Sequence, residues 1–170
     1  MIVQGSDPEL TTDFVSMGVP LDGNFFTFTG FRGRFSAGPG ETATKTAFVS
    51  DFPALHGLGI SNALMYFQPG GILALHFHPR GSKLIYVIQG TLTVGFIDSK
   101  DKLFNQTLQA NDVFVVPRGM VHFMVNLDPQ KEVKVIFSFS SANPGIVNLS
   151  SKLLLSDMPQ LVLQQPLNMV

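Results

Sequence analysis

The sequence predicts an all-β protein built as an antiparallel sandwich or barrel. From about residue 46 to residue 141, the chain is a series of short runs rich in β-branched, aromatic and other apolar residues. Turn-forming residues, above all glycine, proline and asparagine, separate consecutive runs. Short runs at this spacing are typical of antiparallel strands and not of alternating strands and helices.

The expected strands follow one another along this region. Eight are predicted, and they span residues 61–68, 72–78, 83–89, 91–97, 103–108, 112–116, 121–126 and 132–139. The clearest breaks combine proline with glycine, and they are Pro69-Gly70-Gly71, Pro79-Arg80-Gly81 and Pro117-Arg118-Gly119. Each break supplies the backbone conformations that a tight turn needs.

The flanking segments have weaker patterns. Residues 24–28 (NFFTF) are a candidate aromatic strand, and the glycines and proline of residues 30–45 predict a loop. Residues 151–165 predict one or two short helices, interrupted by Pro159. We therefore expect one domain with three parts: an N-terminal extension with loops packing on the barrel (1–45), a core (46–142) and a partly helical C-terminal segment (143–170).

Composition excludes several classes of protein. The 170 residues are 45% hydrophobic and 14% charged, with a formal net charge of −1, so a nucleic-acid partner is not expected. No apolar run has the length of about 18 residues that a membrane span needs, and residues 1–5 are too short for a signal peptide. The absence of cysteine excludes disulfides, a thiolate zinc site and a cysteine nucleophile.

Alternation along three strands places reactive side chains among apolar ones. Each strand has a face that carries a histidine or lysine, and the members of these faces are Ile72, Ala74, His76 and His78; Lys83, Ile85 and Val87; and Met120, His122 and Met124. The opposite faces are also largely apolar. A monomeric sandwich should have a polar outer face, so we expect another subunit to cover the second face in a homo-oligomer.

Two stretches resemble a known family. GGILALHFHPRGSKLIYVIQGTLTVGF (70–96) and NDVFVVPRGMVHFMVN (111–126) closely resemble the paired signature boxes of the germin and germin-like proteins, plant members of the cupin superfamily. Residues 6–14, 52–61 and 140–147 resemble further segments of this family. The resemblance therefore covers nearly the whole chain.

The resemblance implies a single cupin jelly-roll β-barrel with a short C-terminal helical segment. It also implies a secreted or apoplastic location and an assembly from dimer to hexamer. Typical members bind manganese through three histidines and one glutamate, and the family includes oxalate oxidases, superoxide dismutases and storage, receptor-like or defence proteins. His76, His78 and His122 match the three histidine ligands.

The sequence departs from the family pattern at the metal and substrate positions. Lys83 stands where the glutamate ligand belongs, which inverts the charge. Ala63 and Leu73 stand where oxalate oxidase has asparagines that help to hold substrate, which argues against oxalate chemistry. The cysteine pair of the family is missing as well.

Lys83 also bears on the cofactor. Three imidazoles alone can hold a first-row divalent ion, but manganese favours a carboxylate. An ammonium about 4 Å from a dication is repelled by about 8 kcal/mol at an effective dielectric constant near 20. Lys83 could point to solvent or lose its proton on burial. The expected cofactor is thus either none or a divalent metal, manganese by resemblance, held by His76, His78 and His122.

The leading hypothesis is an enzyme with a small-molecule substrate. Lys83 and the three histidines are expected to share a site inside the barrel and to act as catalytic acids and bases. The expected apolar pocket is lined by Ile72, Ala74, Ile85, Val87, Met120 and Met124. The substrate would be a small hydrophobic organic compound, such as a plant metabolite, and the reaction a non-redox isomerisation, cyclisation or elimination.

Two alternatives stay open. In the first, the three histidines bind a divalent metal in a secreted protein of the oxidase or dismutase type. In the second, the protein is a non-enzymatic ligand-binding or storage protein, or methionine and phenylalanine simply fill the barrel. Two sequons, at Asn105 and Asn148, are candidate glycosylation sites if the protein is secreted.

Overall fold

The computed structural model describes residues 22–154 and residue 159, and within them ten strands form two five-stranded sheets. The first sheet contains, in spatial order, β1 (Thr42–Ala47), β2 (Ser61–Phe67), β9 (Val133–Phe139), β4 (Lys83–Gln89) and β7 (Val113–Val116). The second contains β10 (Val147–Asn148), β3 (Ile72–Phe77), β8 (Val121–Val125), β5 (Leu92–Ile97) and β6 (Leu103–Leu108). The helical elements are the 3-10 turn η1 (Pro53–Leu55) and α1 (Leu149–Leu154).

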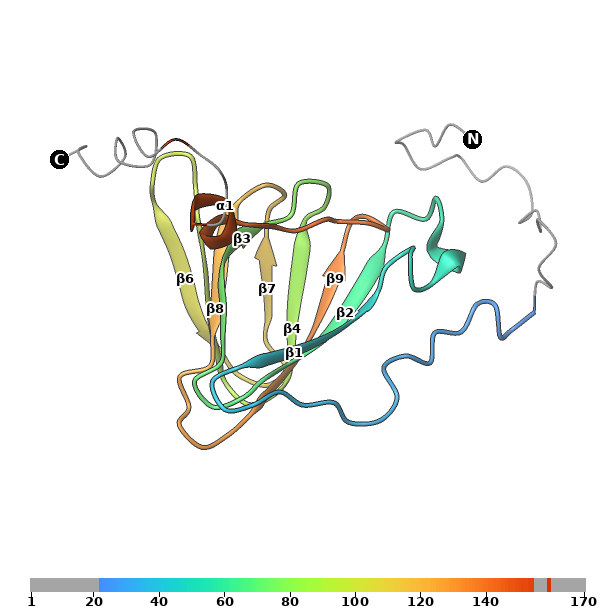
Figure 1. The fold of residues 1–170 in the computed structure, drawn as a ribbon, viewed down its shortest axis with the longest axis horizontal. Helices are drawn as coiled ribbons and strands as arrows, with labels where there is room; N and C mark the ends of the chain where they lie inside the picture. Colours follow the sequence, from blue (N-terminus) through green and yellow to red (C-terminus); the bar gives the residue numbers. More distant parts are fainter. Residues whose placement is uncertain (1–21, 155–158, 160–170) are drawn as a thin grey trace.

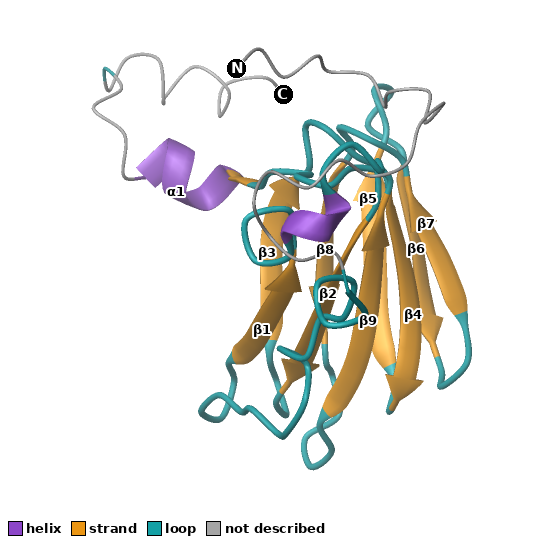
Figure 2. Cartoon of the chain, turned by 90° about the vertical axis from the view of Figure 1, so that its right-hand side faces the viewer, coloured by secondary structure: helices purple, strands orange, loops and turns teal. Residues whose placement is uncertain are grey.

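The two sheets face one another and form a jelly-roll barrel (Figure 1). Each strand pairs with its neighbours in the antiparallel sense. Loops gather at both ends of the strands, and α1 contacts β3 and β10 (Figure 2). The predicted all-β jelly roll with a short C-terminal helix is therefore confirmed. Among the described residues, no helix combines the length and the apolar character needed to span a bilayer.

The core lies between the sheets and consists of side chains at alternate positions. On β4, Ile85 and Val87 are fully buried while Leu84 and Tyr86 are exposed. The buried apolar cluster is Ala63, Met65, Phe67, Ile85, Val87, Leu92, Val94, Leu108, Val116, Met124, Val133, Val135, Phe137 and Phe139. Period-two alternation therefore determines which side chains reach the interior.

The eight predicted strands correspond to β2–β9, and their ends differ by at most one residue. Two expectations for the N-terminal flank are wrong. Residues 24–28 form turns and irregular backbone instead of a strand, and β1 begins at Thr42, inside the segment predicted to be a loop. The predicted boundary at residues 45 and 46 thus falls within β1. The division into domains stays a prediction. The structure does not describe residues 1–21, which include the family-like residues 6–14, or residues 155–158 and 160–170.

An irregularity in β3 corrects the predicted inward faces of Ile72 and Ala74. The pairing of β3 with β8 changes register between Leu73 and His76. The bulge reverses the alternation, so that Ile72 and Ala74 are exposed while His76 is completely buried. Neither Ile72 nor Ala74 lines the interior, and period-two alternation failed here because it assumes a regular strand.

The buried amide of Asn126 ties the connection after β8 to the rest of the sheet. Its Nδ2, which carries two hydrogens, lies within hydrogen-bonding distance of three carbonyl oxygens, so one hydrogen is shared; they belong to Phe67 (3.3 Å), Gln68 (3.0 Å) and Lys131 (2.8 Å). Its Oδ1 accepts a hydrogen bond from the backbone N–H of Asp128 at 3.0 Å. One fully buried side chain therefore satisfies four backbone groups from two different segments.

We expect Asn126→Ala to destabilise the protein strongly. The substitution leaves buried carbonyl groups without donors, and the free energy of unfolding should fall by about 2–4 kcal/mol. Chemical denaturation measures this change. The neighbouring Leu127 is 71% exposed, so the control Leu127→Ala should change the free energy by about 0.5 kcal/mol or less. Equal effects of the two substitutions would contradict the assigned role of Asn126.

Candidate functional site

The three histidines lie together in the barrel interior. His76 is on β3 and His122 is on β8, and the two residues pair directly across the strands. His78 follows the end of β3. All three are buried, with exposures of 0%, 1% and 6% for His76, His122 and His78. One ring nitrogen of each lies within 4.8 Å of the other two. The predicted convergence of the three histidines is thus observed.

Backbone carbonyl groups fix the orientation of each imidazole. The Nδ1 of His76 donates to the carbonyl oxygen of Ala74 at 2.7 Å, and the Nδ1 of His122 donates to that of Met120 at 2.8 Å. The Nδ1 of His78 donates to the carbonyl oxygen of Gly145. Because a carbonyl group can only accept, each Nδ1 carries the hydrogen and each Nε2 presents a lone pair.

Lys83 enters this cluster from the first position of β4. Its side chain is 2% exposed, so it does not point to solvent. Its Nζ lies 3.3 Å from the Nε2 of His122 and 3.5 Å from the Nε2 of His76. The amine can donate a hydrogen to both lone pairs. The structure therefore brings Lys83 and the three histidines into one cluster.

Two aromatic rings that the sequence analysis did not single out complete the surroundings of the amine. The Nζ of Lys83 lies 4.2 Å from the ring centroid of Phe137 and 5.7 Å from that of Phe139. Both phenylalanines are on β9, next to β4, and both face the interior. Alternation along the predicted strand 132–139 could have identified them, because Phe137 and Phe139 share its inner face. Aromatic faces stabilise a nearby cation.

Burial changes the protonation of all four groups. It lowers the pKa of Lys83 from 10.5 to about 7, because the charged form loses its hydration. Burial, and then repulsion from Lys83, lowers the pKa of His76 to about 3 and that of His78 to about 4. The same causes lower the pKa of His122 to about 2. The three imidazoles are therefore neutral at physiological pH.

His78 differs from the other two histidines in its support and its partners. Its buried Nε2 has no hydrogen-bond partner among the described residues. The Gly145 carbonyl that holds its Nδ1 belongs to a loop that Arg80 anchors, with Nε donating to the Asn143 carbonyl oxygen (2.6 Å) and Nη2 to Asn143 Oδ1 (2.9 Å). Gly145 has a φ of 66°, and a side chain there would collide with the Arg80 guanidinium. The unpartnered Nε2 is thus a well-positioned acceptor.

The remaining predicted lining residues divide into two groups. Ile85, Val87 and Met124 are fully buried, and the half-buried Met120 packs against the core. These four surround the interior with apolar groups, unlike the exposed Ile72 and Ala74 described above. Ala63 is in the core and Leu73 packs against it, so neither position offers a polar atom to a ligand.

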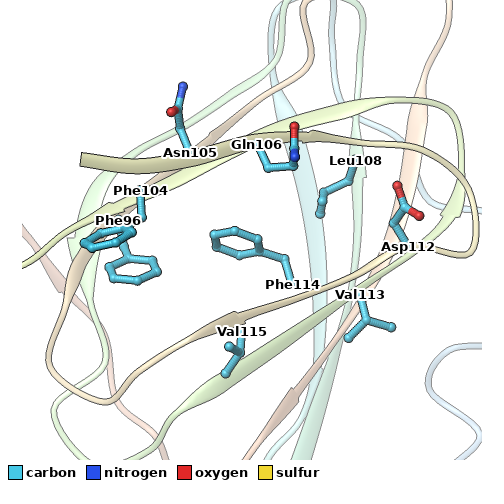
Figure 3. Close-up of a pocket in the computed structure, with 9 residues that line it drawn as sticks. All are labelled: Phe96, Phe104, Asn105, Gln106, Leu108, Asp112, Val113, Phe114 and Val115. Atoms are coloured by element: carbon cyan, nitrogen blue, oxygen red, sulfur yellow. The ribbon is translucent and has the colours of Figure 1, made fainter. Parts of the chain in front are cut away.

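A separate groove lies between the edge strands β6 and β7. It has a volume of about 640 Å³, and Figure 3 shows Phe114 in the middle of the lining residues, with Phe96 and Phe104 together at one end. The rings of Phe96 and Phe104 stack at a centroid distance of 5.1 Å. The other lining residues are Asn105, Gln106, Leu108, Asp112, Val113 and Val115. Sequence reasoning missed this groove, since it forms only where the two sheets are open at their edges.

Comparison with known proteins agrees with the fold. The family model described as Cupin matches residues 34–169. Germin-like protein 9-3 of Oryza sativa subsp. japonica is 39% identical over 158 residues, which are 87% of this chain and 73% of that protein. Germin-like protein 9-1 of the same organism is 36% identical over 172 residues, 96% of this chain and 68% of that protein. The chain belongs to the cupin family, within its germin-like proteins.

Solved structures extend the comparison to an enzyme of the family. The structure of an oxalate oxidase in complex with the substrate analogue glycolate is similar, with a TM-score of 0.83 and 30% sequence identity. The similarity covers 97% of this chain and 87% of that one. The jelly-roll barrel is thus shared over nearly its full extent.

The donor set fits a divalent metal only in part. Three Nε2 lone pairs held by hydrogen bonds at Nδ1 are the arrangement that a zinc or manganese site uses, and the unpartnered Nε2 of His78 is consistent with it. The Lys83 amine is not consistent with a metal site. It already donates to two of these lone pairs, and it brings positive charge where the family has a carboxylate. As they stand, these residues do not fit a manganese ion.

Proposed function

We propose that this germin-like protein is an enzyme that performs non-redox acid–base chemistry on a small hydrophobic organic substrate. The observation that carries this proposal is the buried Lys83 amine within hydrogen-bonding distance of two histidines. An amine and a neutral imidazole together can donate one proton and accept another. Isomerisation, cyclisation and elimination need only such paired transfers.

The geometry supports distinct roles for the four polar residues. Lys83 Nζ carries hydrogen and can act as the acid toward a substrate atom. The Nε2 of His78 is the available base, because no group in the described part of the chain occupies its lone pair. His76 and His122 hold the amine between them as hydrogen-bond acceptors and orient it. The apolar groups Ile85, Val87, Met120 and Met124 suit a hydrophobic substrate.

Lys83→Met should abolish turnover while the fold is kept. Methionine has a similar length and no proton to transfer, so the rate should fall by about 10²–10⁴-fold. A library of plant metabolites is first screened by thermal shift, and each stabilising compound is then incubated with enzyme and analysed by mass spectrometry. The control Lys102→Met removes an amine that lies over Phe104 on the exposed strand β6. Full turnover by Lys83→Met would contradict the role of the lysine.

A carrier or storage role is the outcome if ligands bind but are not converted. A bound ligand stabilises the folded protein by mass action whether or not it reacts. Compounds that raise the melting temperature and are recovered unchanged would therefore identify a ligand-binding protein. A new product that depends on enzyme concentration would identify an enzyme.

The metal-dependent alternative is a secreted protein of the oxidase or dismutase type. Its support is the three-histidine group and the similarity to oxalate oxidase. Against a bound metal stands Lys83, and against oxalate as the substrate stand the apolar residues Ala63 and Leu73. We expect about 0.1 metal ions or fewer per chain in protein purified without chelator, given the charge repulsion. Stoichiometric manganese, zinc, iron or copper, measured by mass spectrometry, would favour this alternative.

We also propose that the protein forms homo-oligomers through the outer face of β4 and β7. Five apolar side chains with exposures of 37–56% lie side by side there, and they are Leu84, Tyr86, Ile88, Val113 and Val115. A contiguous exposed apolar patch of this kind is typical of a subunit interface.

Light scattering after gel filtration should give the mass of at least two chains. Val115→Glu places a charge in the centre of the face and should shift the mass toward one chain. The control Leu103→Glu alters a residue of similar exposure on β6, in the other sheet, and should leave the mass unchanged. A monomeric unmodified protein would contradict the proposed interface.

Secretion is a proposal that rests on the germin-like relatives. Both sequon asparagines, Asn105 and Asn148, are exposed and thus accessible to glycosylation. Glycopeptides at either position in protein isolated from a plant host would support a secretory route.

A further inference from the structure

We propose that the Lys83 amine takes the place of a metal ion in the three-histidine centre, and that this one side chain keeps the centre free of metal. The inference rests on the geometry of the centre alone. It requires no substrate, so it stands or fails separately from the proposed acid–base chemistry.

The three histidines are oriented by the protein backbone and not by a bound ion. Each Nδ1 is held by a backbone carbonyl group, those of Ala74, Met120 and Gly145. For His76 and His122, the accepting carbonyl group belongs to the residue two positions earlier in the chain. The three lone pairs therefore point inward whatever lies between them.

The Lys83 amine binds the same imidazole lone pairs that a metal ion would bind. The Nζ of Lys83 is 3.3 Å and 3.5 Å from two Nε2 atoms. Its remaining surroundings include the ring faces of Phe137 and Phe139. A donor that hydrogen-bonds to these nitrogens must be displaced before they can bind an ion.

The charges of the residues around the centre also disfavour a divalent ion. Within the described part of the chain, the cluster able to hold a metal consists of His76, His78 and His122, with no aspartate or glutamate. Lys83 adds no anionic ligand either, because an amine is either neutral or positively charged. A divalent ion would meet an ammonium and no anionic ligand, which is unfavourable in a buried site.

The backbone pairing of β4 keeps the Lys83 side chain directed toward the three histidines. Lys83 pairs with Val116 of β7 on one side and with Phe139 of β9 on the other. A central strand held on both sides cannot rotate its inward side chain to solvent without breaking the sheet. Any residue at position 83 consequently faces the three histidines.

The test compares metal uptake by the unmodified protein, Lys83→Glu and Lys83→Met. Each protein is incubated with Mn²⁺ or Co²⁺, dialysed, and analysed for metal per chain. Electron paramagnetic resonance of Mn²⁺ and the visible absorption of Co²⁺ report the coordination. Lys83→Glu exchanges the amine for a carboxylate on a side chain one bond shorter, and it should retain close to one Mn²⁺ per chain.

Lys83→Met removes the amine without adding a ligand. It should bind Co²⁺ through three imidazoles at least about 100-fold more tightly than the unmodified protein, because the charge repulsion is gone. This second variant keeps the test informative if the buried carboxylate of Lys83→Glu prevents folding. In both backgrounds, the added substitution His78→Ala should abolish uptake, which ties the metal to this centre.

Two results would overturn the inference. One is equal metal affinity in the unmodified protein and in Lys83→Met, since the lysine would then exclude nothing. The other is a folded Lys83→Glu or Lys83→Met, with an unchanged circular dichroism spectrum, that takes up neither ion.

Discussion

The electrostatics of the three-histidine centre depend on the hydrogen bonds between the Lys83 amine and the imidazoles of His76 and His122. A cation buried among apolar side chains is costly unless it is paired. Here its partners are two neutral lone pairs and the faces of Phe137 and Phe139, and no carboxylate of residues 22–154 forms an ion pair with it. Dipoles and ring faces compensate a charge less completely than an anion does. The result is a lowered pKa of the lysine instead of an ion pair, and such an amine can exchange its proton.

The histidines contribute rigidity in two different ways. His76 and His122 are bound to carbonyl groups two residues earlier, so the local strand backbone alone sets their orientation. His78 depends instead on Gly145, 67 residues later in the chain, and on the anchoring of that loop by Arg80. The position of the unpartnered Nε2 is therefore coupled to a loop at the end of the barrel. Movement of this loop would reorient His78 without changing the hydrogen bonds of Lys83 with His76 and His122.

Alternation predicted much of this arrangement, and its failures have identifiable physical causes. It placed Lys83, Ile85, Val87, His122 and Met124 inside, because β8 and the part of β4 from Lys83 to Val87 are regular. It misplaced Ile72 and Ala74, because a bulge in β3 depends on pairing with β8 that a single strand does not encode. It put Lys83 on the inward face but did not decide whether the amine stays buried there, since burial of an amine depends on acceptors supplied by other strands. The groove between β6 and β7 escaped it because the groove forms between edge strands of two different sheets.

Position 83 then determines the electrostatics of the centre while the histidines stay constant. A lysine there contributes a charge of up to +1 and a carboxylate contributes −1, at the same place in the same strand. A change of two charge units at fixed geometry is enough to separate a site that excludes divalent ions from one that attracts them. A metal ion also binds by mass action and can be lost, whereas an amine attached to the chain is present in every folded molecule. Under the proposal made above, a centre with a tethered cation is therefore independent of metal supply.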